Sequence, residues 1–180
     1  MAMLRVSITA DDHIQGSEDA ATTLVEYGDY ECPHCGAAHH VVKQLQRHYG
    51  KGLRFVFRNF PLAQIHAQAE AAAEAAEFAG ANDKFWEMHD GIYENQQRLG
   101  ITLLLELAGR IGLAGDDLRK SLESHEYAAK VRQDFLGGVR SGVNGTPAFF
   151  INGLRHDGAY DFEILKAAIE GQLLQMKAAG

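Results

Sequence analysis

The chain has 180 residues, with 17 basic and 24 acidic side chains and a formal net charge of −7 at pH 7. No stretch gathers Lys and Arg as a phosphate-binding surface does, so nucleic acid is not expected as a partner. The longest apolar runs, such as 71–73 and 148–151, are far shorter than the roughly 20 residues that span a bilayer. We therefore expect one domain, or one domain with a sizeable insertion, and no membrane insertion.

The first residues, Met-Ala-Met-Leu-Arg-Val-Ser-Ile, lack the apolar core of roughly 7 to 15 residues that a secretory signal requires. As written, the chain is expected to act in the cytoplasm. Removal of a native signal would instead place it in the periplasm or elsewhere outside the cytoplasm.

Strand, helix and strand signals follow one another in the first third of the chain. Residues 22–27 are rich in β-branched and aromatic side chains, and Gly28 and Asp29 end this predicted strand. Apolar residues recur at helical spacing over 38–49, and residues 54–58 form a second predicted strand. These elements predict a βαβ unit with parallel strands, in which the helix begins just after the first strand ends.

Residues 65–142 follow a helical pattern, since alanine dominates 65–79 and apolar residues then recur at three- and four-residue steps. We predict four or five helices here. Glu70, Glu74 and Glu77 indicate a solvent-facing side for the alanine-rich helix. No linker sets the segment apart, so we interpret it as an insertion rather than an independent domain.

The last part of the chain predicts two short strands and a helix. The runs 148–151 and 154–157 are joined by Asn152-Gly153, a dipeptide that favours a type I′ hairpin. Asp161 can cap a final helix. The predicted order is βαβ, a helical block, and ββα.

Chemistry is concentrated in the run Cys32-Pro33-His34-Cys35. A disulfide between residues so close together removes little chain entropy, so the pair indicates redox or metal chemistry rather than a structural staple. At a helix start, Cys32 would face unpaired backbone amides and the positive end of the helix dipole, which stabilise a thiolate. His34 could add a donor or a positive charge, and Cys35, one turn further in, would be the resolving thiol.

Two motifs and the helical insertion between them resemble the DsbA-like branch of the thioredoxin superfamily. The first motif is Glu-Tyr-Gly-Asp-Tyr-Glu-Cys-Pro-His-Cys over 26–35, and the second is Gly-Thr-Pro-Ala-Phe-Phe-Ile-Asn-Gly over 145–153. Residues 58–62 and 85–89 are also similar to thioredoxin-like domains attached to bacterial sodium/proton antiporters. The resemblance covers about residues 20 to 175.

The resemblance implies an α/β, thioredoxin-like fold with an all-helical insertion. Residues 1–64 and 143–180 would form the thioredoxin-like domain, and residues 65–142 the insertion. It also implies protein or peptide thiols and disulfides as substrates, an unidentified redox partner, and no cofactor beyond a redox-active disulfide between Cys32 and Cys35. The Cys-Pro-His-Cys variant is associated with oxidising members of the family, so a DsbA-like dithiol oxidase is expected.

Further site residues follow from the same resemblance. Pro147 falls where the family has a cis-proline facing the disulfide, so Thr146, Pro147 and Pro33 are predicted to contact substrate. A cis bond would let the backbone of Thr146 pair with an extended peptide. Glu26 matches an acidic position beneath the disulfide and could accept a proton from Cys35. From the strand pattern alone, Glu26 would lie on a solvent-facing side.

Two other functions stay open. The first is a redox-sensing domain whose disulfide state changes the binding of a partner. The second is a metal-binding or peptide-binding module, in which His39 and His40 would join the two thiolates around zinc. No second Cys-X-X-Cys or spaced His pair completes a tetrahedral set, so no metal is assigned.

Overall fold

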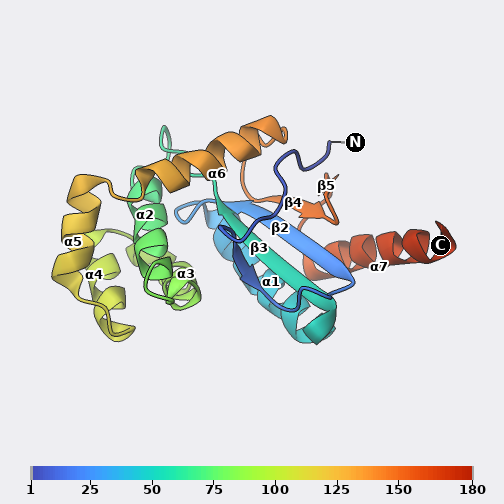
Figure 1. Cartoon of the computed structure of the whole chain (residues 1–180), viewed down its shortest axis with the longest axis horizontal. Coiled ribbons are helices and arrows are strands. Elements are labelled where there is room, and N and C mark those ends of the chain that lie inside the picture. Colours follow the sequence, from blue (N-terminus) through green and yellow to red (C-terminus); the bar gives the residue numbers. More distant parts are fainter. Residues whose placement is uncertain (1, 180) are drawn as a thin grey trace.

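The computed structural model describes residues 2–179. Residue 1, the first of the predicted thioredoxin-like domain, and residue 180, its last, lie outside the described residues. A mixed five-stranded sheet with the order β1-β3-β2-β4-β5 runs through the molecule (Figure 1). Its strands are β1 (His13–Gln15), β2 (Thr22–Gly28), β3 (Leu53–Asn59), β4 (Ala148–Ile151) and β5 (Leu154–His156). The α-helices are α1 (Pro33–Tyr49), α2 (Ala69–Gly80), α3 (Phe85–Glu94), α4 (Ile101–Arg110), α5 (Gly115–Ser124), α6 (Ala128–Arg140) and α7 (Phe162–Ala179).

The predicted βαβ unit is confirmed. Strands β2 and β3 pair in parallel, with Glu26 opposite Phe57, and α1 connects them. Strand β2 is central, because β4 pairs with its other edge in the antiparallel direction. The short strand β1 was not predicted, since three residues are too few to show an alternating pattern.

The predicted hairpin and final helix are also confirmed. Asn152 and Gly153 have φ angles of 48° and 82°, as the two central residues of a type I′ turn require, and they join β4 to β5. The backbone amide of Ile164 donates a hydrogen bond to Asp161 Oδ1 at 3.1 Å, which caps α7.

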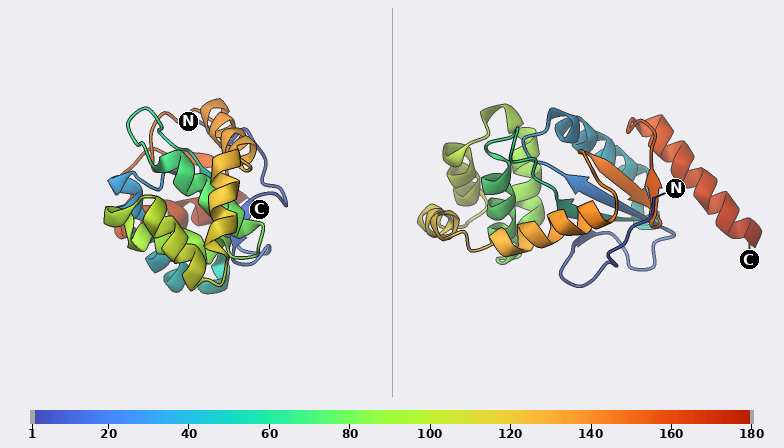
Figure 2. Two further views of the ribbon diagram at one scale, coloured as in Figure 1. Left: turned by 90° about the vertical axis from the view of Figure 1, so that its left-hand side faces the viewer. Right: turned by 90° about the horizontal axis from the view of Figure 1, so that it is seen from above.

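Each face of the sheet is covered by helices or chain segments, so the sheet lies in the interior. One apolar cluster joins the sheet residues Leu24 and Phe55 to Val42 of α1 and Ile169 of α7. The other cluster lies on the opposite face, where Phe135 of α6 stacks on Phe60. The right-hand view in Figure 2 shows α6 running back from the helical region alongside the strands.

Five helices, α2 to α6, lie between β3 and β4 in the chain, which agrees with the four or five predicted. Helices α2 to α5 gather beyond the end of the sheet where β2 and β3 end, as Figures 1 and 2 show. The predicted solvent-facing side of α2 is wrong for Glu74 and Glu77, which are buried. Glu74 faces the end of α5, where its Oε1 lies 3.1 Å from His125 Nδ1. Glu77 faces the sheet instead, where it bonds to His13 at 2.8 Å and accepts from Asn59 Nδ2 at 2.6 Å. No helix within residues 2–179 is long and apolar enough to cross a membrane.

Candidate active site

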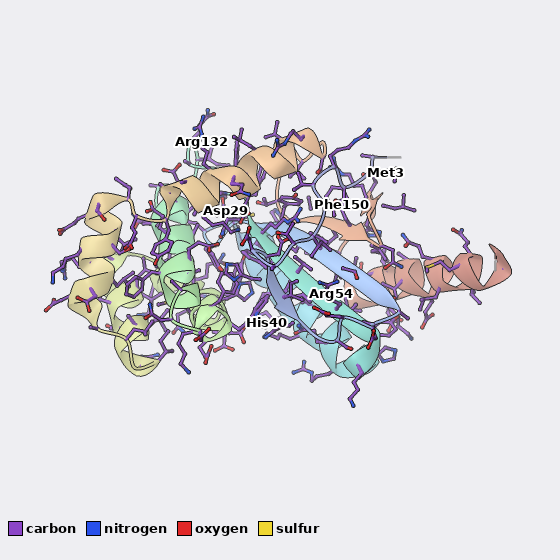
Figure 3. All side chains as sticks on the ribbon, in the orientation of Figure 1. Met3, Asp29, His40, Arg54, Arg132 and Phe150 are labelled. Carbon is purple, nitrogen blue, oxygen red and sulfur yellow. The ribbon has the colours of Figure 1, made fainter. Side chains whose placement is uncertain are left out.

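The two cysteines lie where β2 gives way to α1. Cys32 is the N-cap residue of α1 and Pro33 follows at the start of the helix, where its missing amide hydrogen costs nothing. Both cysteines are free thiols and both are buried, with exposed fractions of 4% for Cys32 and 0% for Cys35. Figure 3 labels Asp29 in this segment, at the end of the sheet that faces α2 and α3.

The start of α1 stabilises negative charge on Cys32. A hydrogen bond from the Cys35 thiol, with others from the backbone amides of Cys35 and His34, lowers the pKa of Cys32 to about 5. These donors outweigh the opposing effect of burial. Because the ordinary thiol pKa is near 8.5, Cys32 is a thiolate at neutral pH.

Cys35 lies in the opposite environment. Burial raises its pKa well above the ordinary value, and hydrogen bonding to Cys32 and the charge of Glu26 act in the same direction. The backbone amide of Asp29 donates to Cys35 Sγ at 3.4 Å, but this bond only partly offsets the effect of burial. Cys35 is therefore a neutral thiol in the reduced protein.

Glu26 lies in the interior beside the cysteines rather than on a solvent-facing side. Its exposed fraction is 2%, because β2 is a central strand with both faces covered. Burial, and secondarily the charge of Cys32, raises the pKa of Glu26 to about 8. Its Oε1 atom has no hydrogen-bond partner within residues 2–179. A neutral carboxyl with a free oxygen can exchange a proton with a neighbouring group.

The second motif meets the first at the sulfur of Cys32. Cys32 Sγ lies 3.5 Å from the backbone carbonyl oxygen of Thr146 and can donate to it as a thiol. The Thr146–Pro147 peptide bond is cis. The structure thus brings together residues that are 114 positions apart in the chain.

His34 is exposed and points toward the segment before α7. Its Nδ1 lies 2.8 Å from the hydroxyl of Tyr160, which is half-buried. Burial raises the pKa of Tyr160, and the charges of Cys32 and Cys35 add to that effect. Sequence reasoning missed Tyr160, which belongs to no recognisable motif.

Asp29 joins the cysteine motif to the segment after β3, and sequence reasoning missed this role as well. Its Oδ1 accepts the backbone amides of Glu31 at 2.8 Å and Cys32 at 3.2 Å. Its Oδ2 accepts the amide of Leu62 and bonds to His66 Nδ1, both at 2.8 Å. Asp29 thereby fixes the backbone amide of Cys32 while it holds His66 beside the site.

The pKa of His66 depends on its charged neighbours Asp29 and Cys32. Its burial lowers the pKa, but the hydrogen bond to Asp29 and the charges of Asp29 and Cys32 outweigh burial, so the pKa is raised. Protonation of His66 and ionisation of Cys32 therefore favour each other.

Gln96 adds a contact from the helical region. Its Nε2 donates to the carbonyl oxygens of Tyr30 at 2.9 Å and Cys32 at 2.8 Å. The carbonyls of the cysteine loop are therefore bonded by a side chain that lies beyond α3.

The alternative in which His39 and His40 join the two thiolates around zinc finds no support in the geometry. Within residues 2–179, the group that could hold a metal contains His39 but neither cysteine. His39 lies one helical turn after Cys35 and faces α3 instead.

A cavity of about 610 Å³ lies next to the site. Leu62, whose amide is bound by Asp29, and Asn144, two residues before Thr146, line it together with the apolar side chains of Ile65 and Phe135. Ile65 is largely exposed. Neither cysteine lines the cavity, whose wall also carries charged side chains such as Glu70 and Arg132.

Comparisons with known proteins agree with this fold. The family model described as Thioredoxin matches residues 9–171. The Na(+)/H(+) antiporter NhaA 1 of Salinispora arenicola is 43% identical over 167 residues, and one from Mycobacterium sp. (strain KMS) is 38% identical over 161. These matches cover 92% and 88% of this chain but only 26% of each antiporter, so the chain spans about a quarter of their length.

Solved structures with similar folds include oxidised BdbD from Bacillus subtilis, with a TM-score of 0.85 and 24% identity over 96% of this chain and 98% of that one. A thioredoxin-like oxidoreductase from Silicibacter pomeroyi has a TM-score of 0.80 and 26% identity, covering 91% of this chain and 93% of that one. The α-DsbA1 of Wolbachia pipientis, at 19% identity and a TM-score of 0.80, covers 94% of this chain and 96% of that one. With a family match over most of its length and a DsbA-type arrangement of sheet and helices, the chain belongs to the thioredoxin family.

Proposed function

We propose that the chain catalyses thiol-disulfide exchange with protein or peptide substrates through Cys32 and Cys35, as a DsbA-like dithiol oxidase. The observation that carries this proposal is the contrast between the two sulfurs. One is held as a thiolate by hydrogen-bond donors, and the other is kept protonated by burial. An asymmetric pair of this kind supplies a reactive sulfur and a resolving sulfur.

Oxidation of a substrate dithiol proceeds in two steps. A substrate thiolate attacks Cys32 Sγ of the enzyme disulfide, the bond to Cys35 breaks, and Cys35 leaves with the bonding electrons and takes up a proton. Glu26, neutral near pH 7, is the proton source we assign to that step. A second substrate thiolate then attacks the substrate sulfur of the mixed disulfide, and Cys32 leaves as a thiolate. The substrate has lost two electrons and the enzyme disulfide has gained them.

The oxidising direction follows from the leaving group. The low pKa of Cys32 stabilises the reduced enzyme, so the disulfide form tends to take electrons from its substrate. An oxidase of this kind would act in a compartment more oxidising than the cytoplasm. A redox partner that reoxidises the pair completes the cycle.

Substrate binding is assigned to the surface around Cys32. We propose that an extended peptide pairs with the backbone at Thr146 and packs on Pro33 and Pro147, in the manner of strand addition. The carbonyl of Thr146 beside Cys32 Sγ supports this placement, because a bound strand there would bring its own cysteine to Cys32. The neighbouring cavity has room for side chains that flank that cysteine.

The test is turnover with a reduced two-cysteine peptide and oxidised glutathione as the recycling oxidant. We expect many peptide disulfides per enzyme molecule, none with Cys32→Ser, and trapped enzyme–peptide mixed disulfides with Cys35→Ser, because no resolving thiol remains. Turnover by Cys32→Ser equal to that of the unaltered protein would refute the proposal.

A redox-sensing role is the second candidate, and one observation favours it. In the relatives named Na(+)/H(+) antiporter NhaA, the matching stretch is 26% of a longer protein. A disulfide in such a module could change the binding of a neighbouring domain once per oxidation. A single stoichiometric oxidation without recycling by oxidised glutathione would favour the sensor over the oxidase.

A further inference from the structure

Two buried histidines and an aspartate converge between α1 and α3, apart from the cysteines. His39 belongs to α1, and His89 and Asp90 belong to α3. One ligand atom from each lies within 4.8 Å of the other two, and His39 Nε2 is 3.9 Å from Asp90 Oδ1. The exposed fractions of His39 and His89 are only 3% and 2%. The three side chains therefore offer two imidazole nitrogens and a carboxylate oxygen at one point.

Neighbouring groups already occupy the second polar atom of two of these side chains. His89 Nδ1 is bonded to the Tyr30 hydroxyl at 2.9 Å, which leaves Nε2 as its available nitrogen. Asp90 Oδ2 accepts from Lys43 Nζ at 2.7 Å, which leaves Oδ1. Outer contacts of this kind orient the ligands of metal sites.

The environment of Asp90 Oδ1 indicates that this atom binds a ligand. The atom is shielded from solvent and has no hydrogen-bond partner within residues 2–179. A buried carboxylate oxygen left without a partner is unfavourable, and native structures normally supply a donor or a cation. The available donor set of two imidazoles and one carboxylate is the type that binds zinc with one position left for water.

The surroundings suit a metal of that class. Both imidazoles are almost fully buried, so an ion bound between them would be shielded from bulk water. Tyr93 stacks on His39 at 5.1 Å and Phe57 packs edge-on to His89 at 4.5 Å, which gives the group an aromatic wall.

We propose that His39, His89 and Asp90 bind a zinc ion, with water in the remaining position, and that the ion links α1 to α3. Helix α1 carries the cysteines and α3 belongs to the helical region, so the metal would tie the redox helix to its neighbour. The proposal does not depend on thiol-disulfide exchange, because neither cysteine is a ligand.

The experiment uses the full chain with its cysteines first oxidised to the disulfide, so that no thiolate can bind metal. After chelator treatment, Co²⁺ is titrated as a spectroscopic probe and Zn²⁺ is then added as competitor. We expect one equivalent of Co²⁺ with visible d–d absorption, no sulfur charge-transfer band, displacement by Zn²⁺, and a higher Tm with Zn²⁺.

Matched variants locate the site. Asp90→Asn and His39→Gln should each weaken Co²⁺ binding by at least roughly tenfold. His40→Gln should not, because His40, labelled in Figure 3, is exposed and lies outside the cluster. Asp90 is partly exposed, so its variant should fold. Circular dichroism of each variant checks that point.

Lys43→Met distinguishes a metal site at Asp90 from an Asp90–Lys43 ion pair that has only a structural role. Removing the ammonium frees Asp90 and takes away a cation that repels the metal, so Co²⁺ binding should tighten. If Asp90 served only to pair with Lys43, this variant would leave metal binding unchanged. The proposal is overturned if the oxidised chain binds no stoichiometric Co²⁺, if Asp90→Asn and His39→Gln bind as the unaltered chain does, or if binding requires reduced cysteines.

Discussion

Cys32 and Cys35 are the same residue type three positions apart, yet the protein treats them in opposite ways. Around Cys32, at the start of α1, hydrogen-bond donors lower its pKa to about 5. Cys35 and Glu26 lie deeper in the interior, where burial is the largest influence and raises the pKa of both groups. The contrast shows that hydrogen-bond donors, first the Cys35 thiol and then backbone amides, decide which sulfur carries the charge, since Cys32 is itself only 4% exposed.

The largest expected effect comes from removing one sulfur at a time. Cys32→Ser should abolish exchange in both directions, whereas Cys35→Ser should keep the first attack and stop at the mixed disulfide. Non-reducing gels after incubation with a disulfide-containing peptide distinguish the two variants. Equal accumulation of mixed disulfide in both variants would contradict the different roles assigned to Cys32 and Cys35.

The second effect is the pH dependence of thiol reactivity. Alkylation of reduced protein by iodoacetamide, followed by mass spectrometry, should give a midpoint near pH 5 at Cys32. Cys35 should stay unmodified over the pH range in which Cys32 reacts, because burial holds its pKa well above the ordinary value. A common midpoint for the two cysteines would show that their environments do not differ as described.

Glu26→Gln tests the proton transfer assigned to the buried carboxyl beside Cys35. Without a titratable proton beside Cys35, the exchange rate should fall by about 10²-fold, which stopped-flow measurements of tryptophan fluorescence can follow. Trp86 is the only tryptophan in the sequence.

The same substitution gives a stability signature. Because the pKa of Glu26 is raised to about 8, the folded protein keeps a proton that the unfolded chain loses above pH 4.5. The free energy of unfolding should therefore fall as the pH rises from about 4.5 to 8, and the Gln variant should lack this fall. Urea unfolding of the oxidised form of both proteins, in which the cysteines do not titrate, isolates the part of the fall that burial of Glu26 causes, because the Cys32 charge that also raises its pKa is absent there. Parallel pH profiles would place Glu26 in water.

The smallest effect concerns His66. His66→Gln retains a donor for Asp29 but removes a cation that favours the Cys32 thiolate, so the pKa of Cys32 should rise by about one unit or less. The alkylation profile measures this shift, with His40→Gln as the control. A lower pKa of Cys32 in the His66→Gln variant would contradict the predicted direction of the shift.

Local patterns explain what could be predicted from the sequence. The strand before Cys32, the helix after it, and the Asn152-Gly153 hairpin are set by neighbouring residues, so they could be predicted without a structure. The approach of Thr146 to Cys32 was accessible only through the family resemblance, because no local signal joins residues 114 apart.

Other parts of the site could not be predicted. Asp29 signalled the end of a strand, but its bond to His66 spans 37 positions, and those of Gln96 to Cys32 and His34 to Tyr160 span 64 and 126. These contacts arise from tertiary packing, and no spacing in the sequence encodes them. Glu74 shows the same limit, since an acidic residue on an alanine-rich helix indicates solvent until α5 and α6 are known to cover it.

The most direct test of the account is the reduction potential of the Cys32–Cys35 pair, measured by equilibration against graded glutathione buffers with alkylation and mass spectrometry. The stabilised thiolate at Cys32 predicts an oxidising potential, nearer ~−120 mV than the ~−270 mV of a reductase. A value near ~−270 mV would contradict the claim that the start of α1 stabilises the reduced form, and so would the absence of a reversible disulfide.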